Sequence, residues 1–121
     1  MGQPVVYFDI GCKEQEKTEG FYSEIFGWKP IDRSENTVML DTAPHGIPGA
    51  ITSLGHEPHN YVMIYIEVDD IPAYLEKIEA NGGEVLVPMT EIPDGGHFAW
   101  FGDPEGNMIG LLDPGSDDET E

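Results

Sequence analysis

The sequence predicts an α+β domain that is built from two tandem βαβββ modules. The order of one strand, one helix and three strands occurs twice, at about 3–54 and 60–114. The glycines that follow the two predicted helices, Gly27 and Gly82, lie 55 residues apart. The 121 residues make about one domain, so two similar halves imply one mostly antiparallel sheet with both helices on its outer face.

The first module begins with a strand at Val5–Ile10, where β-branched and aromatic residues follow Pro4. A helix is predicted over Lys13–Phe26, because its apolar residues recur on one face and Gly27 follows the last of them. Turn-rich pieces then separate three short apolar runs, which predict strands at Trp28–Asp32, Thr37–Asp41 and Pro48–Leu54.

The second module repeats this plan. A strand at Tyr61–Val68 leads to a helix that begins near Ile71, where Asp69 or Asp70 is the N-cap, and that ends at Asn81-Gly82-Gly83. The residues Asp103-Pro104-Glu105-Gly106 predict a type I turn that closes a hairpin. Strands are expected at Glu84–Met89, His97–Gly102 and Asn107–Leu112.

Alternation along the strands predicts which side chains turn away from the helices. In the first strand Val6, Phe8 and Ile10 form the apolar, helix-facing set, and in the fifth strand Val62, Ile64, Ile66 and Val68 do so. The opposite face is mixed in polarity, as a partly wet binding pocket requires. It carries Tyr7, Asp9, Met63, Tyr65, Glu67, Met108 and Gly110.

The charge balance restricts the partners. The chain has 24 acidic and 5 basic residues, a net charge of −19, so nucleic acids and anionic membranes would be repelled. We interpret the acidity as a solvated surface, adapted to a cytoplasm of high salt. Cys12 is the only cysteine, which excludes an internal disulfide, and no apolar run or leader-like start indicates membrane insertion or secretion. The last residues, 115–121, predict an acidic disordered tail.

Three segments together resemble the vicinal oxygen chelate superfamily, which includes glyoxalase I, bleomycin resistance proteins, extradiol dioxygenases and fosfomycin resistance enzymes. They are FYSEIFGW (Phe21–Trp28), EVDDIPAYLEKIEANGGEV (Glu67–Val85) and FGDPEGNMIGLLDP (Phe101–Pro114). The resemblance covers Val5 to Pro114. It implies that the sheet is cupped around a small-molecule site and that the protein is a homodimer, for which exposed sheet edges are a second argument.

The resemblance also implies where a divalent metal ion would be held. Counting from the matched segments places the four ligand positions of the family at Tyr7, near Thr52, at Met63 and at Gly110. Imidazole or carboxylate ligands are absent from all four positions, so we expect no metal and no other cofactor. A metal held unconventionally, for example by Asp9, Glu67 and His97, stays an alternative.

We therefore predict that the protein binds a small organic molecule. The predicted wall of the pocket is Tyr7, Asp9, Met63, Tyr65, His97 and Met108. A lyase or isomerase of the glyoxalase type, with Asp9 and His97 as acid and base, is the main alternative, followed by a dioxygenase-like enzyme and by an interaction module without pocket chemistry. The remaining histidines, His45, His56 and His59, lie in turn-rich segments and are interpreted as loop residues.

Overall fold

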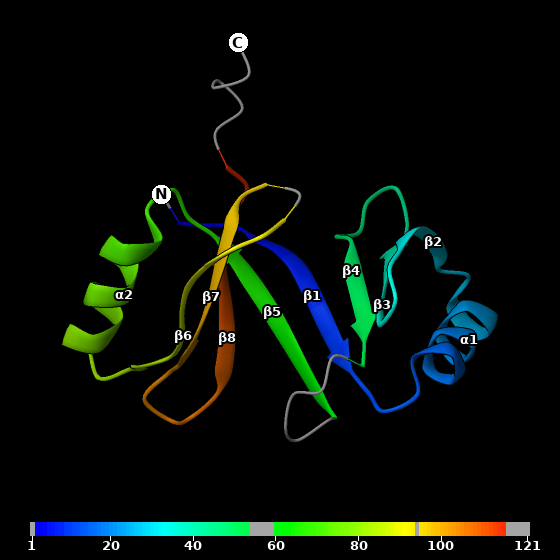
Figure 1. The fold of residues 1–121 in the computed structure, drawn as a ribbon, viewed down its shortest axis with the longest axis horizontal. Coiled ribbons are helices and arrows are strands. Elements are labelled where there is room, and N and C mark those ends of the chain that lie inside the picture. Colours follow the sequence, from blue (N-terminus) through cyan, green and yellow to red (C-terminus); the bar gives the residue numbers. More distant parts are fainter. Residues whose placement is uncertain (1, 54–59, 94, 116–121) are drawn as a thin grey trace, which may run out of the picture. The chain divides into compact units, whose positions relative to one another are not determined.

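The computed structural model describes residues 2–53, 60–93 and 95–115. Its eight strands form a mixed, open sheet in the order β2-β3-β4-β1-β5-β8-β7-β6, with two helices (Figure 1). The predicted α+β class is thereby confirmed. The chain divides into two compact units, which we call the N-terminal unit (Val6–Ile64) and the C-terminal unit (from Tyr65 onward, with the residues up to Val5).

The N-terminal unit contains β1 (Val5–Gly11), α1 (Gln15–Phe26), β2 (Lys29–Arg33), β3 (Thr37–Asp41) and β4 (Gly49–Thr52). Strand β1 pairs in parallel with β4, and the pairs β4–β3 and β3–β2 are antiparallel. Helix α1 packs on β3 and β4. Below it lies a buried cluster of Cys12, Val38, Leu40 and Ile51, against which Ile10, Tyr22 and Trp28 pack.

Helix α1 ends where the sequence predicts and starts two residues later. Gly27 has φ 74°, a left-handed conformation that glycine adopts without strain, and its N–H donates to the carbonyl of Ser23 at 2.9 Å. At the other end Glu14 is the N-cap residue but its side chain makes no capping hydrogen bond. Of the predicted helix, only Lys13 and Glu14 lie outside α1.

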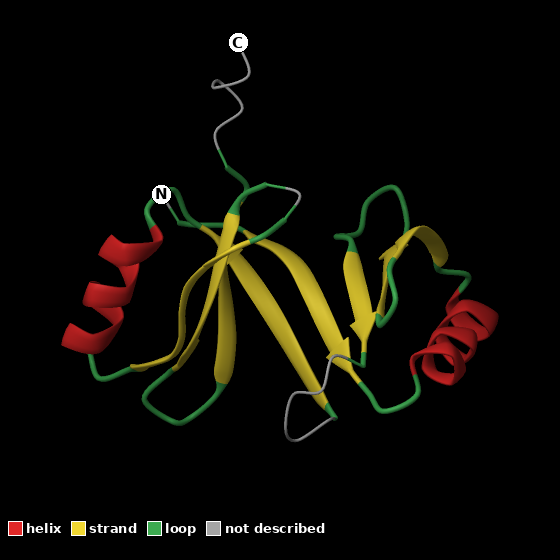
Figure 2. Ribbon diagram, in the orientation of Figure 1, coloured by secondary structure: helices red, strands yellow, loops and turns green. Residues whose placement is uncertain are grey.

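The C-terminal unit contains the last three residues of β5 (Tyr61–Glu67), whose first four belong to the N-terminal unit. It also contains α2 (Ile71–Ala80), β6 (Glu84–Glu91), β7 (His97–Gly102) and β8 (Met108–Asp113). Strand β5 pairs in parallel with β8, and the pairs β8–β7 and β7–β6 are antiparallel. Helix α2 packs on these last three strands (Figure 2). The core of the C-terminal unit is a buried cluster of Val68, Ile71, Ala99 and Leu111.

The local signals of this unit act as predicted. The Asp70 carboxylate accepts the N–H of Ala73 at 3.1 Å, which caps α2. At the β7–β8 turn the N–H of Gly106 donates to the carbonyl of Asp103 at 2.8 Å, as a β-turn requires. The Asp103 side chain also accepts the N–H groups of Glu105 and Asn107, both at 2.9 Å.

Strand β5 departs from the predicted burial. Val62 and Ile64, expected beneath a helix, are 72% and 38% exposed, whereas Met63 and Tyr65 are 1% and 6% exposed. The reason is coverage: α1 packs on β3 and β4, and α2 packs on β6, β7 and β8, so β5 receives little of either helix. The side chains of β5 that are buried are thus those on the predicted pocket face.

Two further predictions concern segments that the structure describes only in part. The segment between the modules and the acidic tail lie mostly outside the described residues, apart from Asn60 and Gly115. Among the residues that are described, no helix is long and apolar enough to cross a membrane.

Candidate functional site

One face of the N-terminal unit carries three of the predicted site residues. The parallel register places Asp9 beside Ala50 and Ile10 beside Ile51. Because Ile10 and Ile51 belong to the core below α1, alternation places Tyr7, Asp9, Ala50 and Thr52 on the opposite face. The first module thus presents a phenol and a carboxylate two residues apart on the face that α1 does not cover.

Asp9 acts electrostatically on two phenols. Burial is the main cause that raises the pKa of Tyr7, and the negative charge of Asp9 raises it further. Burial also raises the pKa of Tyr61 to about 12, with smaller contributions from Asp9 and Cys12. Both phenols are therefore neutral at neutral pH and remain available as hydrogen-bonding groups.

Thr52 and Met63, two of the four family ligand positions, are enclosed by protein. Thr52 is 5% exposed, and its hydroxyl oxygen lies 2.8 Å from that of Thr37. Met63 is 1% exposed and offers only a thioether. Neither side chain supplies the imidazole or carboxylate that a hard divalent ion requires.

The fourth position, Gly110, is covered by an aromatic ring. Gly110 lies beside Tyr65 in the β5–β8 register. A Cβ atom at Gly110 would lie 2.9 Å from Cζ of Tyr65 and closer still to Cδ2 and Cε2. The indole N–H of Trp100 donates to the Tyr65 hydroxyl at 2.9 Å. This bond holds the ring in the space that a ligand side chain at Gly110 would need.

The residues at the family's ligand positions therefore do not fit a divalent metal. Tyr7, Thr52, Met63 and Gly110 provide no imidazole or carboxylate, and the last of them has no room for a side chain. Of the alternative set, Asp9 belongs to the N-terminal unit, and Glu67 and His97 belong to the C-terminal unit. Within the described ranges, no three His, Cys, Asp or Glu residues come close enough to hold a metal ion.

His97 lies on the other face from the one we predicted. Its register partner is Asp113, and Ala99 is paired with the core residue Leu111 on the α2 side. Alternation places His97 on that same side, whereas Tyr65, Trp100 and Met108 share the opposite face. The His97 Nδ1 atom is 3.7 Å from Asp113 Oδ2 and is buried without a hydrogen-bond partner among the described residues. The alternation of this strand relative to α2 depends on the β7–β8 register, which the sequence alone does not provide.

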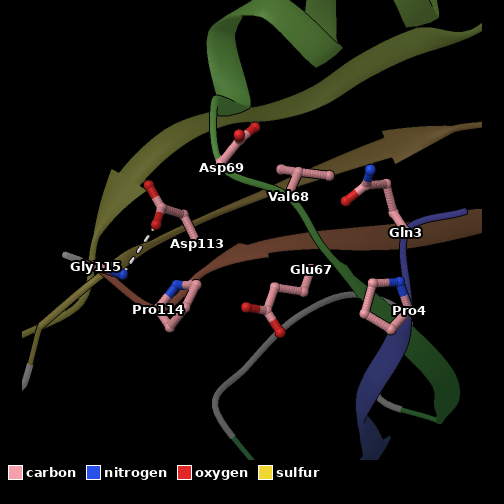
Figure 3. Close-up of a pocket in the computed structure, with 8 residues that line it drawn as sticks. All are labelled: Gln3, Pro4, Glu67, Val68, Asp69, Asp113, Pro114 and Gly115. Atoms are coloured by element: carbon pink, nitrogen blue, oxygen red, sulfur yellow. Dashed lines mark hydrogen bonds between the residues drawn. The ribbon is translucent and has the colours of Figure 1, made fainter. Parts of the chain in front are cut away.

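A pocket of about 470 Å³ in the C-terminal unit is strongly acidic (Figure 3). Three carboxylates, Glu67, Asp69 and Asp113, line it together with Pro4 and Gly115. Asp113 Oδ1 accepts the N–H of Gly115 at 2.9 Å. No basic side chain belongs to the lining, so this pocket would repel an anion.

Two residues that the sequence reasoning did not select belong to these arrangements. Tyr61 is the first residue of β5, and its alternation with Met63 and Tyr65 could have included it. From the sequence, Trp100 is expected in the core or in the wall of the pocket, where its ring can stack on a flat ligand. Its bond to Tyr65 joins residues 35 positions apart, which strand periodicity alone does not predict.

A family model for the glyoxalase/bleomycin resistance protein/dioxygenase superfamily matches residues 5–111. The chain belongs to this superfamily. A glyoxylase-like domain-containing protein of Didymella fabae is 32% identical over 108 residues, which cover 82% of this chain and 84% of that protein. The putative glyoxylase CFP32 of Mycobacterium bovis is 26% identical over 120 residues, covering 87% of this chain and 43% of the mycobacterial protein. The superfamily member described here thus spans less than half of that relative's length.

Solved structures share the fold of this superfamily member. The methylmalonyl-CoA epimerase of Streptomyces coelicolor superposes with a TM-score of 0.73 at 18% identity, and the match covers 96% of this chain and all of that one. An identity this low supports a common architecture and leaves the reaction open.

Proposed function

We propose that this superfamily member binds a small organic molecule without a metal ion. The observation that carries the proposal is the Tyr65 ring over Gly110, which fills the place of the family's fourth ligand. The face of β1 and β5 that carries Tyr7, Asp9 and Tyr61 is the proposed binding surface of the N-terminal unit.

The chemistry of this surface favours a ligand with a positively charged or hydrogen-bond-donating group. The Asp9 carboxylate accepts hydrogen bonds and attracts positive charge. The rings of Tyr7 and Tyr61 supply flat apolar surface for the rest of the ligand. The net charge of −19 adds a negative potential to that of Asp9, and this potential also attracts cations.

A thermal-shift screen with Asp9→Asn beside the unchanged protein tests the proposal. A ligand that binds the folded protein raises its midpoint according to RT ln(1 + [L]/Kd), and Asp9→Asn should remove most of that shift. Asp41→Asn is the matched control, because Asp41 is an exposed acid at the end of β3. Equal shifts in all three proteins would contradict the role of Asp9.

The second claim is that no metal ion is bound. Elemental mass spectrometry after incubation with Zn²⁺, Ni²⁺, Mn²⁺ and Fe²⁺ tests it. We expect no stoichiometric metal. About one bound ion per chain that Asp9→Ala abolishes would overturn the proposal and favour a metal-dependent lyase or dioxygenase.

An isomerase or lyase is the second candidate. The Asp9 carboxylate, a base, lies close enough to influence two neutral phenols, which are acids, and general acid–base catalysis needs both. Asp9 would remove a proton next to a carbonyl, and Tyr7 or Tyr61 would donate to the oxygen. His97 is not part of this scheme. Turnover that Asp9→Asn abolishes while binding persists would favour this candidate over simple binding.

We further propose a cytoplasmic homodimer, as the family resemblance implies. The exposed apolar residues Val62 and Ile64 on β5 offer a surface that a second copy could cover. Sedimentation equilibrium distinguishes a dimer from a monomer. Val62→Lys should shift a real dimer toward monomer, whereas a monomeric unchanged protein would contradict the proposal.

A further inference from the structure

A second pocket of about 500 Å³ lies in the N-terminal unit, and none of its lining residues belongs to the Tyr7–Asp9–Tyr61 cluster. It is formed by the residues after β1, the first turns of α1 and Asn60, the residue before β5. The side chains that matter here are Cys12, Lys13, Glu14, Lys17, Phe21 and Tyr22.

The charge of this pocket is opposite to that of the protein. It contains two of the five basic residues of the chain and one of its 24 acids. Arg33 pairs with Glu19 at 2.8 Å, but neither Lys13 nor Lys17 forms an ion pair with any carboxylate in the described part of the chain. In a chain so rich in carboxylates, two ammonium groups at one pocket that pair with no carboxylate of the described residues favour an anion from solution.

The aromatic wall beside the lysines is partly fixed and partly open. Tyr22 stacks on Trp28 with ring centroids 5.1 Å apart and planes 6° apart, which fixes the Tyr22 ring. Phe21 meets Tyr22 edge to face at 5.1 Å and is 56% exposed. An exposed ring next to a fixed one offers a surface on which a flat apolar group can pack.

We propose that this pocket binds a small anion carried on a flat apolar group, of the chemical class of the aromatic carboxylates. Lys13 and Lys17 bind the carboxylate, and Phe21 and Tyr22 bind the ring. This site lies beyond the proposed function, whose ligand is drawn by Asp9. The acidic pocket of Figure 3, in which carboxylates replace the lysines, would not accept such a molecule.

The test uses benzoate, with benzyl alcohol and benzylammonium as neutral and cationic probes of the same size. In ¹H–¹⁵N correlation spectra, benzoate should shift the amides of residues 12–22 and Asn60 saturably. Benzyl alcohol should bind about tenfold more weakly, because each of the two exposed charge pairs contributes up to about fivefold in affinity. Raising the salt concentration should weaken benzoate binding, since the lysines are solvent-exposed.

Lys13→Gln/Lys17→Gln should weaken benzoate binding by about tenfold, whereas Lys29→Gln should not. Lys29 is the matched control, because it is an exposed lysine on β2 outside the pocket. Equal losses in both variants would mean that only net charge matters and would overturn the proposal. Equal binding of benzoate and benzyl alcohol, or shifts confined to residues around Asp9, would overturn it as well. The last result would also locate benzoate at the proposed functional surface, so failure of the two proposals can be told apart.

Discussion

Gly110→Ala should destabilise the protein although it adds a single methyl group. The new Cβ would lie within 3 Å of Cζ of Tyr65, and the ring, 6% exposed, has to move. Its hydroxyl is bonded to the Trp100 indole at 2.9 Å, so the movement also breaks or stretches that bond.

The expected cost follows from three contributions. Overpacking a buried site costs about 1–3 kcal/mol, and a disturbed buried hydrogen bond costs about 1 kcal/mol. Replacing glycine stabilises by about 0.4–1 kcal/mol through the unfolded state, because Gly110 has no positive φ that would exclude alanine. The net loss is about 1–3.5 kcal/mol in the free energy of unfolding.

Urea unfolding at fixed salt concentration, followed by tyrosine and tryptophan fluorescence and by circular dichroism, measures this loss. Gly20→Ala is the matched control, because a Cβ at this helical glycine of α1 meets no atom within 4 Å. It should stabilise the protein by up to about 1 kcal/mol. In a Tyr65→Ala background, Gly110→Ala should cost less than about 1 kcal/mol, because the ring that it displaces is gone.

A loss below about 0.5 kcal/mol for Gly110→Ala would refute this reasoning, since surface substitutions without contacts give effects of that size. A loss that persists unchanged in the Tyr65→Ala background would also refute it. In that case the cost would come from the β8 backbone and not from the ring.

Three further predictions follow from the charges. The urea midpoint should rise with NaCl, because shortening the Debye length from about 10 Å at 0.1 M to about 3 Å at 1 M screens the repulsion among a net 19 negative charges; a midpoint that is flat in salt would contradict this. Asp9→Asn should lower the pKa of Tyr61 from about 12, because one negative charge is removed while burial remains; ultraviolet titration of phenolate absorbance measures this, and an unchanged Tyr61 titration would refute it. Arg33 holds the pKa of the Glu19 carboxyl below its ordinary value of 4.5. The unchanged protein should therefore be more stable than Arg33→Met above about pH 4.5, and this difference should disappear as the pH falls below that value. A difference that persists in acid would exclude the ion pair as its cause.

Elements that depend on local signals could be predicted from the sequence. Thr37–Asp41 and His97–Gly102 match the observed strands residue for residue. The end of α1 at Gly27 and the cap of α2 by Asp70 follow from the chemistry of single residues. The physical reason is that caps, turns and strand alternation involve neighbours within about four residues.

The burial of β5 and the arrangement at Gly110 could not be predicted in this way. Whether Val62 is covered depends on where α1 and α2 pack, and that is decided by contacts distant in sequence. The Tyr65 ring meets a glycine 45 positions away, which only the β5–β8 register brings beside it. The position near Thr52 illustrates the same limit. Asp9 and Tyr65 each lie two residues after the first ligand position of their module, Tyr7 and Met63. Asp9 is paired with Ala50 and Tyr65 with Gly110, so the residue of β4 that corresponds to Gly110 is Ala50, two residues before Thr52.

The ring over Gly110 also limits how this sequence can change. Introducing a carboxylate at Gly110 by one codon change would place a side chain where the Tyr65 ring already lies, so the variant would lose stability. Replacing Tyr65 by a smaller residue first would remove the phenol that accepts the Trp100 indole N–H. It would also leave a cavity in place of the ring. Each single step passes through a less stable protein, so placing any larger side chain at position 110 requires two coordinated substitutions, one of them at Tyr65.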